Sequence, residues 1–122
     1  MGKKEKIVYI ATYAGEDPER ATLPFMLATG AQTMEVETVI VLLGKSCYLA
    51  KKGYAEHVSA PGLKPLKEFM DIFFEMGGRL LVCQAAVNEL KIAEQDLIDG
   101  IELTGAGKTT EEILSANATL VF

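Results

Sequence analysis

The chain has 122 residues, of which 49% are hydrophobic and 24% charged, and this composition excludes a disordered polypeptide and fits one globular domain over residues 1–122. Its net charge is −5, and its arginines are only Arg20 and Arg79, so it lacks the coherent basic face of a nucleic-acid-binding protein. No apolar run approaches the ~20 residues that cross a bilayer, and no signal peptide is recognisable. We expect a soluble, cytoplasmic protein with no membrane partner.

The N-terminal segment predicts a buried strand followed by a helix. Residues 6–13 are almost continuously apolar and rich in β-branched and aromatic side chains, which is typical of a strand buried on both faces. Helical spacing of apolar residues over 19–34 predicts a helix that begins near Thr22 or slightly earlier, with Pro24 in its first turn.

The middle of the chain repeats this order. Residues 36–43 predict a second buried strand, and residues 46–52 a short helix with Ser46 as its N-cap. An amphipathic helix is predicted over residues 65–76, and the two glycines after it stop the helix.

The last third of the chain continues the alternation. We expect, in order, a strand at 79–83, a short helix at 84–91, a strand at 101–103, a helix at 109–115 and a strand at 118–122. This alternation predicts an α/β fold, a three-layer α/β/α sandwich with a mostly parallel sheet of about five strands. Ligands of such sheets bind outside the carboxyl ends of the strands.

Cys83 closes the third predicted strand and opens a helix. Unpaired backbone N–H groups at that junction favour the thiolate, which is the reactive form of cysteine. The alternative is a small apolar residue that fills space in the core. Cys47 follows the second strand and would face the same edge, and the two thiols could form a redox pair only if their Cα atoms lie within about 7 Å. The rim of a pocket at this edge is assigned to Tyr13, Gly44, Ser46, Gln84 and Ala85.

The glycine-rich segment 105–110 only partly matches a phosphate-binding loop. Counting back five residues from Gly107 reaches Glu102 rather than a glycine. We interpret the segment as a turn in which Thr109 or Thr110 caps a helix that carries Glu111 and Glu112 in its first turn.

The remaining side chains that could take part in catalysis or metal binding are interpreted as structural. His57 is the only histidine and is interpreted as a loop residue, and two cysteines without zinc spacing indicate free thiols. We expect neither a cofactor nor a metal site. The acidic residues before the fourth strand are interpreted as a solvated face: Glu94, Asp96 and Asp99. The methionines on helix faces are interpreted as core or subunit contacts: Met26, Met34, Met70 and Met76.

Two blocks of sequence carry a resemblance to a known family. Residues 77–86 read Gly-Gly-Arg-Leu-Leu-Val-Cys-Gln-Ala-Ala, and residues 96–103 read Asp-Leu-Ile-Asp-Gly-Ile-Glu-Leu before a Gly-Ala turn, a helix and a last strand that ends in Phe122. With the N-terminal strand, loop and helix, these blocks resemble the DsrE family, the DsrE/DsrF-like and TusD-related sulfur-relay proteins. The resemblance covers nearly the whole chain.

The resemblance implies a role for Cys83. In sulfur-trafficking members the matching cysteine holds sulfane sulfur as a persulfide and passes it to the next protein, and here the backbone of Gln84 and Ala85 would line the mouth of the site. It also implies a homo-oligomer, a trimer or hexamer, with sulfur donor and acceptor proteins as partners.

Three functions stay open at this point. The first is a sulfurtransferase-type carrier in a persulfide relay, with Cys83 as carrier and Cys47 as auxiliary thiol. The second is a non-catalytic oligomeric module that binds a small molecule or serves assembly, in which Cys83 is structural. The third is a thiol redox protein that uses Cys47 and Cys83 together.

Overall fold

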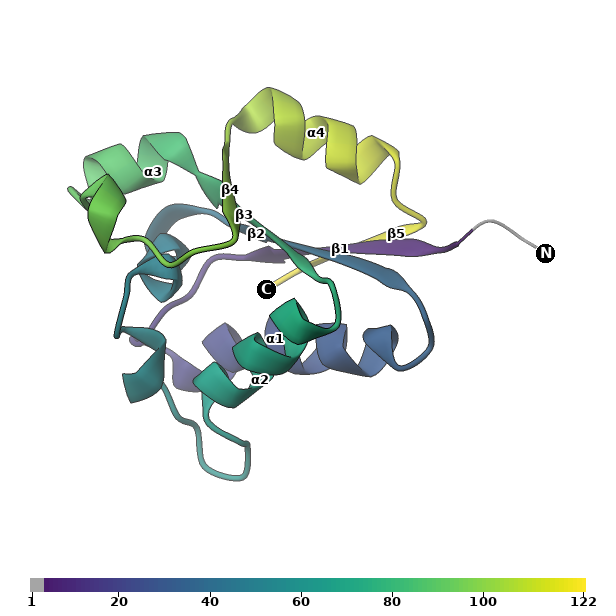
Figure 1. The fold of residues 1–122 in the computed structure, drawn as a ribbon, viewed down its shortest axis with the longest axis horizontal. Helices are drawn as coiled ribbons and strands as arrows, with labels where there is room; N and C mark the ends of the chain where they lie inside the picture. Colours follow the sequence, from purple (N-terminus) through teal and green to yellow (C-terminus); the bar gives the residue numbers. More distant parts are fainter. Residues whose placement is uncertain (1–3) are drawn as a thin grey trace.

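The computed structural model describes residues 4–122, which form a parallel sheet with helices on both faces (Figure 1). The strands are β1 (Lys6–Ala11), β2 (Glu37–Leu42), β3 (Arg79–Cys83), β4 (Ile101–Thr104) and β5 (Ala118–Val121). The α-helices are α1 (Pro18–Gln32), α2 (Leu66–Glu75), α3 (Gln84–Glu89) and α4 (Ala106–Leu114), and the 3-10 helices are η1 (Gly44–Ala50), η2 (Ala55–His57) and η3 (Glu94–Asp96). The predicted α/β/α sandwich is confirmed, and all five strands are parallel.

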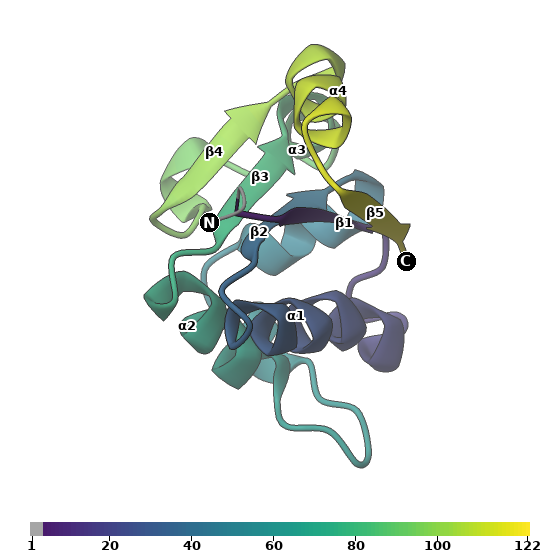
Figure 2. The same ribbon diagram turned by 90° about the vertical axis from the view of Figure 1, so that its right-hand side faces the viewer.

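The strand order explains which helices cover which face. The order is β4-β3-β2-β1-β5, so the first three crossovers all step in the same direction along the sheet. Because crossovers between parallel strands are right-handed, α1, α2 and the β3–β4 connection are placed on one face. The β4–β5 crossover steps back across the sheet, and α4 therefore covers the opposite face (Figure 2).

The larger core lies between the sheet and helices α1 and α2. Phe25 of α1 meets Phe73 of α2 edge to face, with ring centroids 5.7 Å apart, and both side chains are fully buried. Gln32 at the end of α1 donates a 2.9 Å hydrogen bond to the Phe73 carbonyl. A smaller core on the α4 face contains Val8, Ile10, Val39, Val41 and Leu81.

The N-terminal strand and helix differ from the sequence prediction at two points. Strand β1 ends at Ala11 rather than Tyr13. Helix α1 begins at Pro18, with the Asp17 carboxylate accepting the Arg20 N–H at 3.1 Å, so Pro24 lies inside the helix and not in its first turn. A proline there removes one helical hydrogen bond, and burial of its ring offsets part of that loss.

Helix α2 ends as predicted at a pair of glycines. Gly77 has φ +89°, a left-handed conformation that other residues adopt only with strain. Gly78 is needed for a different reason, since a Cβ atom built there would lie 2.3 Å from the buried Phe73 ring.

Helix α4 is where the sequence prediction was wrong. It begins at Ala106, Gly105 is its N-cap, and neither Thr109 nor Thr110 caps it. Glu112 lies in the body of the helix and is buried, although it was predicted in the first turn. The Glu112 carboxylate can be buried because it forms ion pairs with cationic side chains of the sheet.

These ion pairs attach α4 to the sheet. The Glu112 carboxylate lies 2.8 Å from Arg79 Nη2 and 2.5 Å from Lys6 Nζ, and Arg79 also pairs with Glu102 at 2.9 Å. These contacts lower the pKa of Glu112 to about 2, mainly through the hydrogen bonds from Arg79, against the opposing effect of burial. Ion pairs therefore hold α4 against the sheet, where a helix is usually held by apolar side chains.

The other structural interpretations are mostly confirmed. The carboxylate residues Glu94, Asp96 and Asp99 are exposed as predicted, and His57 is exposed too, although it ends the 3-10 helix η2 rather than lying in a loop. Met70 is in the core, but Met34 and Met76 are 76% and 52% exposed and so are not core residues. Within residues 4–122, every helix is too short or too polar to cross a bilayer.

Candidate functional site

The carboxyl edge of the sheet places Cys83 at a junction of two elements. Cys83 is the last residue of β3 and the N-cap of α3, and its thiol is free and half-buried. Gln84 and Ala85 are the first two residues of α3, and both are exposed beside it. A helix start leaves its first backbone N–H groups without intrahelical partners, so Cys83 adjoins such groups as the sequence predicted.

The strand order adds a second helix start to this site. Cys83 pairs in register with Thr104, the last residue of β4. From this pair the chain leaves in opposite directions, since β3 continues into α3 and β4 continues into α4 on the other face. Neighbouring strand ends from which the chain diverges in this way are the usual ligand site of a parallel sheet. Thr104 and Gly105 were missed at the sequence level, because only the strand order places them beside Cys83.

Cys47 lies in η1 with its thiol buried behind Cys83. Its Sγ donates to the Leu42 carbonyl at 3.3 Å and lies 3.9 Å from the Cys83 carbonyl oxygen. Burial raises the pKa of Cys47 to about 11, with the nearby Cys83 charge adding to the increase and the backbone of Cys83 opposing it. The structure thus brings Cys47 against the backbone of Cys83, as a protonated thiol at neutral pH.

The remaining rim residues are split between surface and interior. Gly44 is exposed with φ +58°, which favours glycine at the turn out of β2. Ser46 does not cap a helix, because η1 begins at Gly44 and Leu43 occupies the cap position. The Ser46 hydroxyl is buried and donates to the Ala11 carbonyl at 2.7 Å, so it joins the end of β1 to the turn after β2.

Tyr13 is half-buried in the loop after β1 and contacts Arg20. Arg20 Nη1 donates to the Tyr13 hydroxyl at 3.0 Å, and the guanidinium carbon lies 5.3 Å from the ring centroid. The same loop is held from the other side, because the Gly15 N–H donates to the Tyr54 hydroxyl at 2.8 Å. Tyr54 in turn stacks on Tyr48 of η1 with centroids 5.6 Å apart. The loops around the edge are therefore braced against one another.

The arrangement has the parts of a thiol site rather than a metal site. A half-buried thiol lies at a strand end beside two helix starts, and a buried thiol contacts its backbone from behind. In the part of the chain that the structure describes, no group of three or more His, Cys, Asp or Glu side chains is placed to hold a metal ion.

Comparisons with known proteins agree with this architecture. The structure superposes on the ychN protein from E. coli with a TM-score of 0.81 at 21% identity, covering 97% of this chain and 99% of that one. It also superposes on MTH1491 from Methanobacterium thermoautotrophicum, a protein of unknown function, with a TM-score of 0.69 at 13% identity, covering 98% and 100% of the two chains. At these identities the likeness shows the fold alone.

The sequence comparisons extend over nearly the same length. The uncharacterised protein MJ0760 of Methanocaldococcus jannaschii is 28% identical over 104 residues, and the match covers 85% of this chain but only 38% of that relative. The model of the DsrE/DsrF-like family matches residues 5–122. The chain therefore belongs to the DsrE/DsrF-like family.

Proposed function

We propose that this protein is a cytoplasmic sulfur carrier in which Cys83 holds sulfane sulfur as a persulfide. The observation that supports it best is the position of Cys83, a half-buried free thiol at the end of β3, beside the starts of α3 and α4. Family membership adds to this position, since the DsrE/DsrF-like model matches residues 5–122, which include Cys83.

The transfer step uses only a donor persulfide and the thiolate of Cys83. The thiolate attacks the outer sulfur of R–S–SH, a new S–S bond forms at Cys83, and the donor S–S bond breaks to release R–S⁻. The product Cys83–S–SH carries the transferred sulfur, and its ionised form is stabilised by backbone N–H groups at the helix start. Gln84 and Ala85 would shape the mouth through their backbone, with Tyr13 and Gly44 on the neighbouring loops.

In this proposal Cys47 is an auxiliary thiol rather than a carrier. Its buried S–H group lies against the Cys83 carbonyl and so fixes the backbone that presents the nucleophile. A raised pKa keeps Cys47 protonated, which suits a hydrogen-bond donor and not an attacking group.

Intact-mass measurement after incubation with a persulfide donor tests the proposal. We expect a gain of one sulfur atom that dithiothreitol removes, that is absent in Cys83→Ser and that persists in Cys47→Ala. If no donor adds sulfur to the wild-type protein, or if Cys83→Ser still gains it, the carrier function is wrong.

A thiol redox function is the second candidate, and the contact between Cys47 and the Cys83 carbonyl favours it. Here peroxide would oxidise Cys83 to a sulfenic acid, and Cys47 would condense with it to give a disulfide and water. Loss of both free thiols after peroxide, reversed by dithiothreitol, would support this function over sulfur transport. A sulfenic or sulfinic acid at Cys83 with Cys47 still free would contradict it.

We also propose that the protein acts as a homo-oligomer, a trimer or hexamer. Leu114 at the end of α4 is 80% exposed and Val121 on the edge strand β5 is 72% exposed, and large apolar side chains of this kind are buried in subunit interfaces. Light scattering should give a mass near three or six times 13.2 kDa, and Leu114→Ser should lower it. A monomer at high protein concentration would contradict the proposal.

A further inference from the structure

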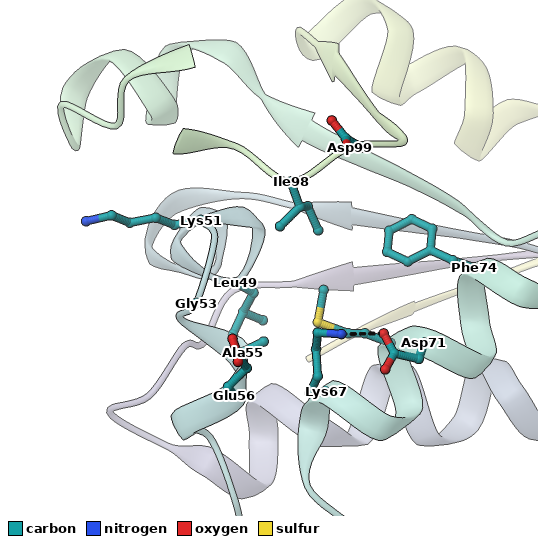
Figure 3. A pocket seen from close by; sticks show the side chains of 11 residues that line it. Leu49, Lys51, Gly53, Ala55, Glu56, Lys67, Asp71, Phe74, Ile98 and Asp99 are labelled. Atoms are coloured by element: carbon teal, nitrogen blue, oxygen red, sulfur yellow. Dashed lines mark hydrogen bonds and ion pairs between the residues drawn. The ribbon is translucent and has the colours of Figure 1, made fainter. Parts of the chain in front are cut away.

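A pocket of about 170 Å³ lies between η1, η2, α2 and the segment that leads into β4 (Figure 3). Its apolar lining comes from Leu49, Met70, Phe74 and Ile98. Leu49 and Met70 are buried, whereas Phe74 and Ile98 are half-buried. None of the lining residues is among those proposed for sulfur transfer, so the pocket is independent of that function.

Backbone contacts hold the walls of this pocket in place. The Ile98 N–H donates to the Ala50 carbonyl at 2.8 Å, and the Lys52 N–H donates to the Asp96 carbonyl at 2.7 Å. Lys51 and Leu97 also form an antiparallel bridge. The segment before β4 is thus fixed against the end of η1, and the pocket exists before any ligand arrives. A preformed apolar pocket of this kind is the usual form of a small-molecule site, because protein interiors otherwise pack without voids.

The volume indicates the size of the ligand. An apolar cavity of about 150 Å³ engineered in another protein is large enough to hold benzene. The pocket here therefore accommodates one aromatic ring, in contact with the Phe74 ring and the Met70 thioether, both of which favour aromatic neighbours.

The charged groups at the mouth of the pocket indicate the sign of the ligand's charge. Lys67 Nζ lies 2.6 Å from the Asp71 carboxylate, so these two groups neutralise each other. Figure 3 shows the Lys51 ammonium directed away from the pocket and the Asp99 carboxylate on its outer side. Glu56 also lines the pocket and forms no salt bridge within residues 4–122. A cationic group at the mouth would find an available carboxylate, whereas an anion would meet net negative charge.

We propose that this pocket binds a small arylalkyl ammonium compound, with its ring on the apolar lining and its ammonium group beside Glu56. The probe is 2-phenylethylammonium, added to protein labelled with ¹³C at the methionine methyl groups. The Met70 methyl should shift with a saturable dependence on concentration, because Met70 is the methionine of the lining. The Met34 methyl should not shift, since this side chain is 76% exposed in the turn after α1 and does not line the pocket.

Charge variants and a charge-reversed probe complete the test. Glu56→Gln should weaken binding of 2-phenylethylammonium about two- to five-fold, as expected for loss of one exposed ion pair, while the distant Glu19→Gln leaves it unchanged. Phenylacetate should bind more weakly than the ammonium probe to the wild-type protein. The proposal is overturned if the Met70 methyl shows no saturable shift, if phenylacetate binds as well as the ammonium compound, or if Glu56→Gln has no effect.

Discussion

Cys47 Sγ lies 3.9 Å from the carbonyl oxygen of Cys83, although the two residues are 36 positions apart in the chain. One thiol is buried and donates hydrogen bonds to main-chain carbonyls, and the other is half-buried at the edge of the sheet. The two cysteines of this protein are therefore chemically distinct, and their difference can be measured directly.

Alkylation with iodoacetamide should modify Cys83 and spare Cys47 in the folded protein. At pH 8 a thiol with a pKa of about 11 is a thiolate in about one molecule in a thousand, and burial further blocks the reagent. Peptide mass spectrometry after short labelling measures both sites, and labelling in denaturant, where both thiols react, is the control. Comparable modification of the two cysteines in the folded protein would contradict the assignment.

Removing the Glu112 carboxylate should destabilise the protein. Glu112→Gln leaves Arg79 and Lys6 without their buried partner, which should cost about 2 kcal/mol, below the range for fully buried pairs because Arg79 is partly exposed. Urea unfolding at pH 7 measures the change. Glu111→Gln is the matched control, since this neighbour is exposed and should have almost no effect.

The same carboxylate should make stability depend on acid pH. Folding lowers the pKa of Glu112 from its usual value of 4.5 to about 2, so its contribution is complete above pH 4.5 and is lost as the pH falls toward 2. Unfolding free energies measured at several pH values between 5 and 2 should fall less steeply for Glu112→Gln than for the wild-type protein. Parallel curves would show that Glu112 is not the group responsible.

Gly78→Ala should be destabilising by about 1–3 kcal/mol through overpacking. The added methyl would lie 2.3 Å from the ring of Phe73, which is fully buried and has no room to move. Gly30→Ala is the control, because a Cβ atom there meets no atom within 4 Å, and alanine in a helix should stabilise by about 0.5–1 kcal/mol. The unfolding temperatures of the two variants should therefore shift in opposite directions from that of the wild-type protein.

Thr38→Val should leave stability unchanged or raise it by up to about 1 kcal/mol. The Thr38 hydroxyl is buried in β2 and has no hydrogen-bond partner among residues 4–122, so replacing it with a methyl group removes an unfavourable burial. Thr22→Val is the comparison, since its buried hydroxyl donates to the Pro18 carbonyl at 2.7 Å and its loss should cost about 1 kcal/mol. A clear loss of stability in Thr38→Val would indicate a partner for this hydroxyl.

The sheet could be predicted from the sequence because β1 and β2 carry nearly continuous apolar, β-branched runs and the later strands alternate with helical segments. Strand β3 begins and ends at the predicted residues, and the other strands differ by at most two residues at either end. Helix α4 could not be placed as well, since its buried residues are Thr109 and Glu112, which give no apolar period. The partners that make Glu112 a buried residue, Lys6 and Arg79, lie far away in the sequence.

The sequence predicts Cys83 as the candidate site residue, but it does not predict which residues surround it. Cys83 was placed at a strand-to-helix junction by local pattern alone. Its pairing with Thr104 depends on β4 lying beside β3, and its contact with Cys47 depends on the path of η1, neither of which a local pattern encodes. Ser46 was placed wrongly because its hydroxyl has a non-local acceptor, the Ala11 carbonyl, rather than a helix to cap.

The ion pairs under α4 also determine how this helix presents its outer side. Apolar contacts tolerate sliding, but a carboxylate that bonds Arg79 and Lys6 at once restricts the axial and rotational setting of the helix. Ile113 and Leu114, the residues that follow Glu112, are therefore held in a fixed orientation on the surface. A surface ordered in advance loses little conformational entropy when it is covered, so polar chemistry inside the molecule would lower the cost of the proposed subunit association.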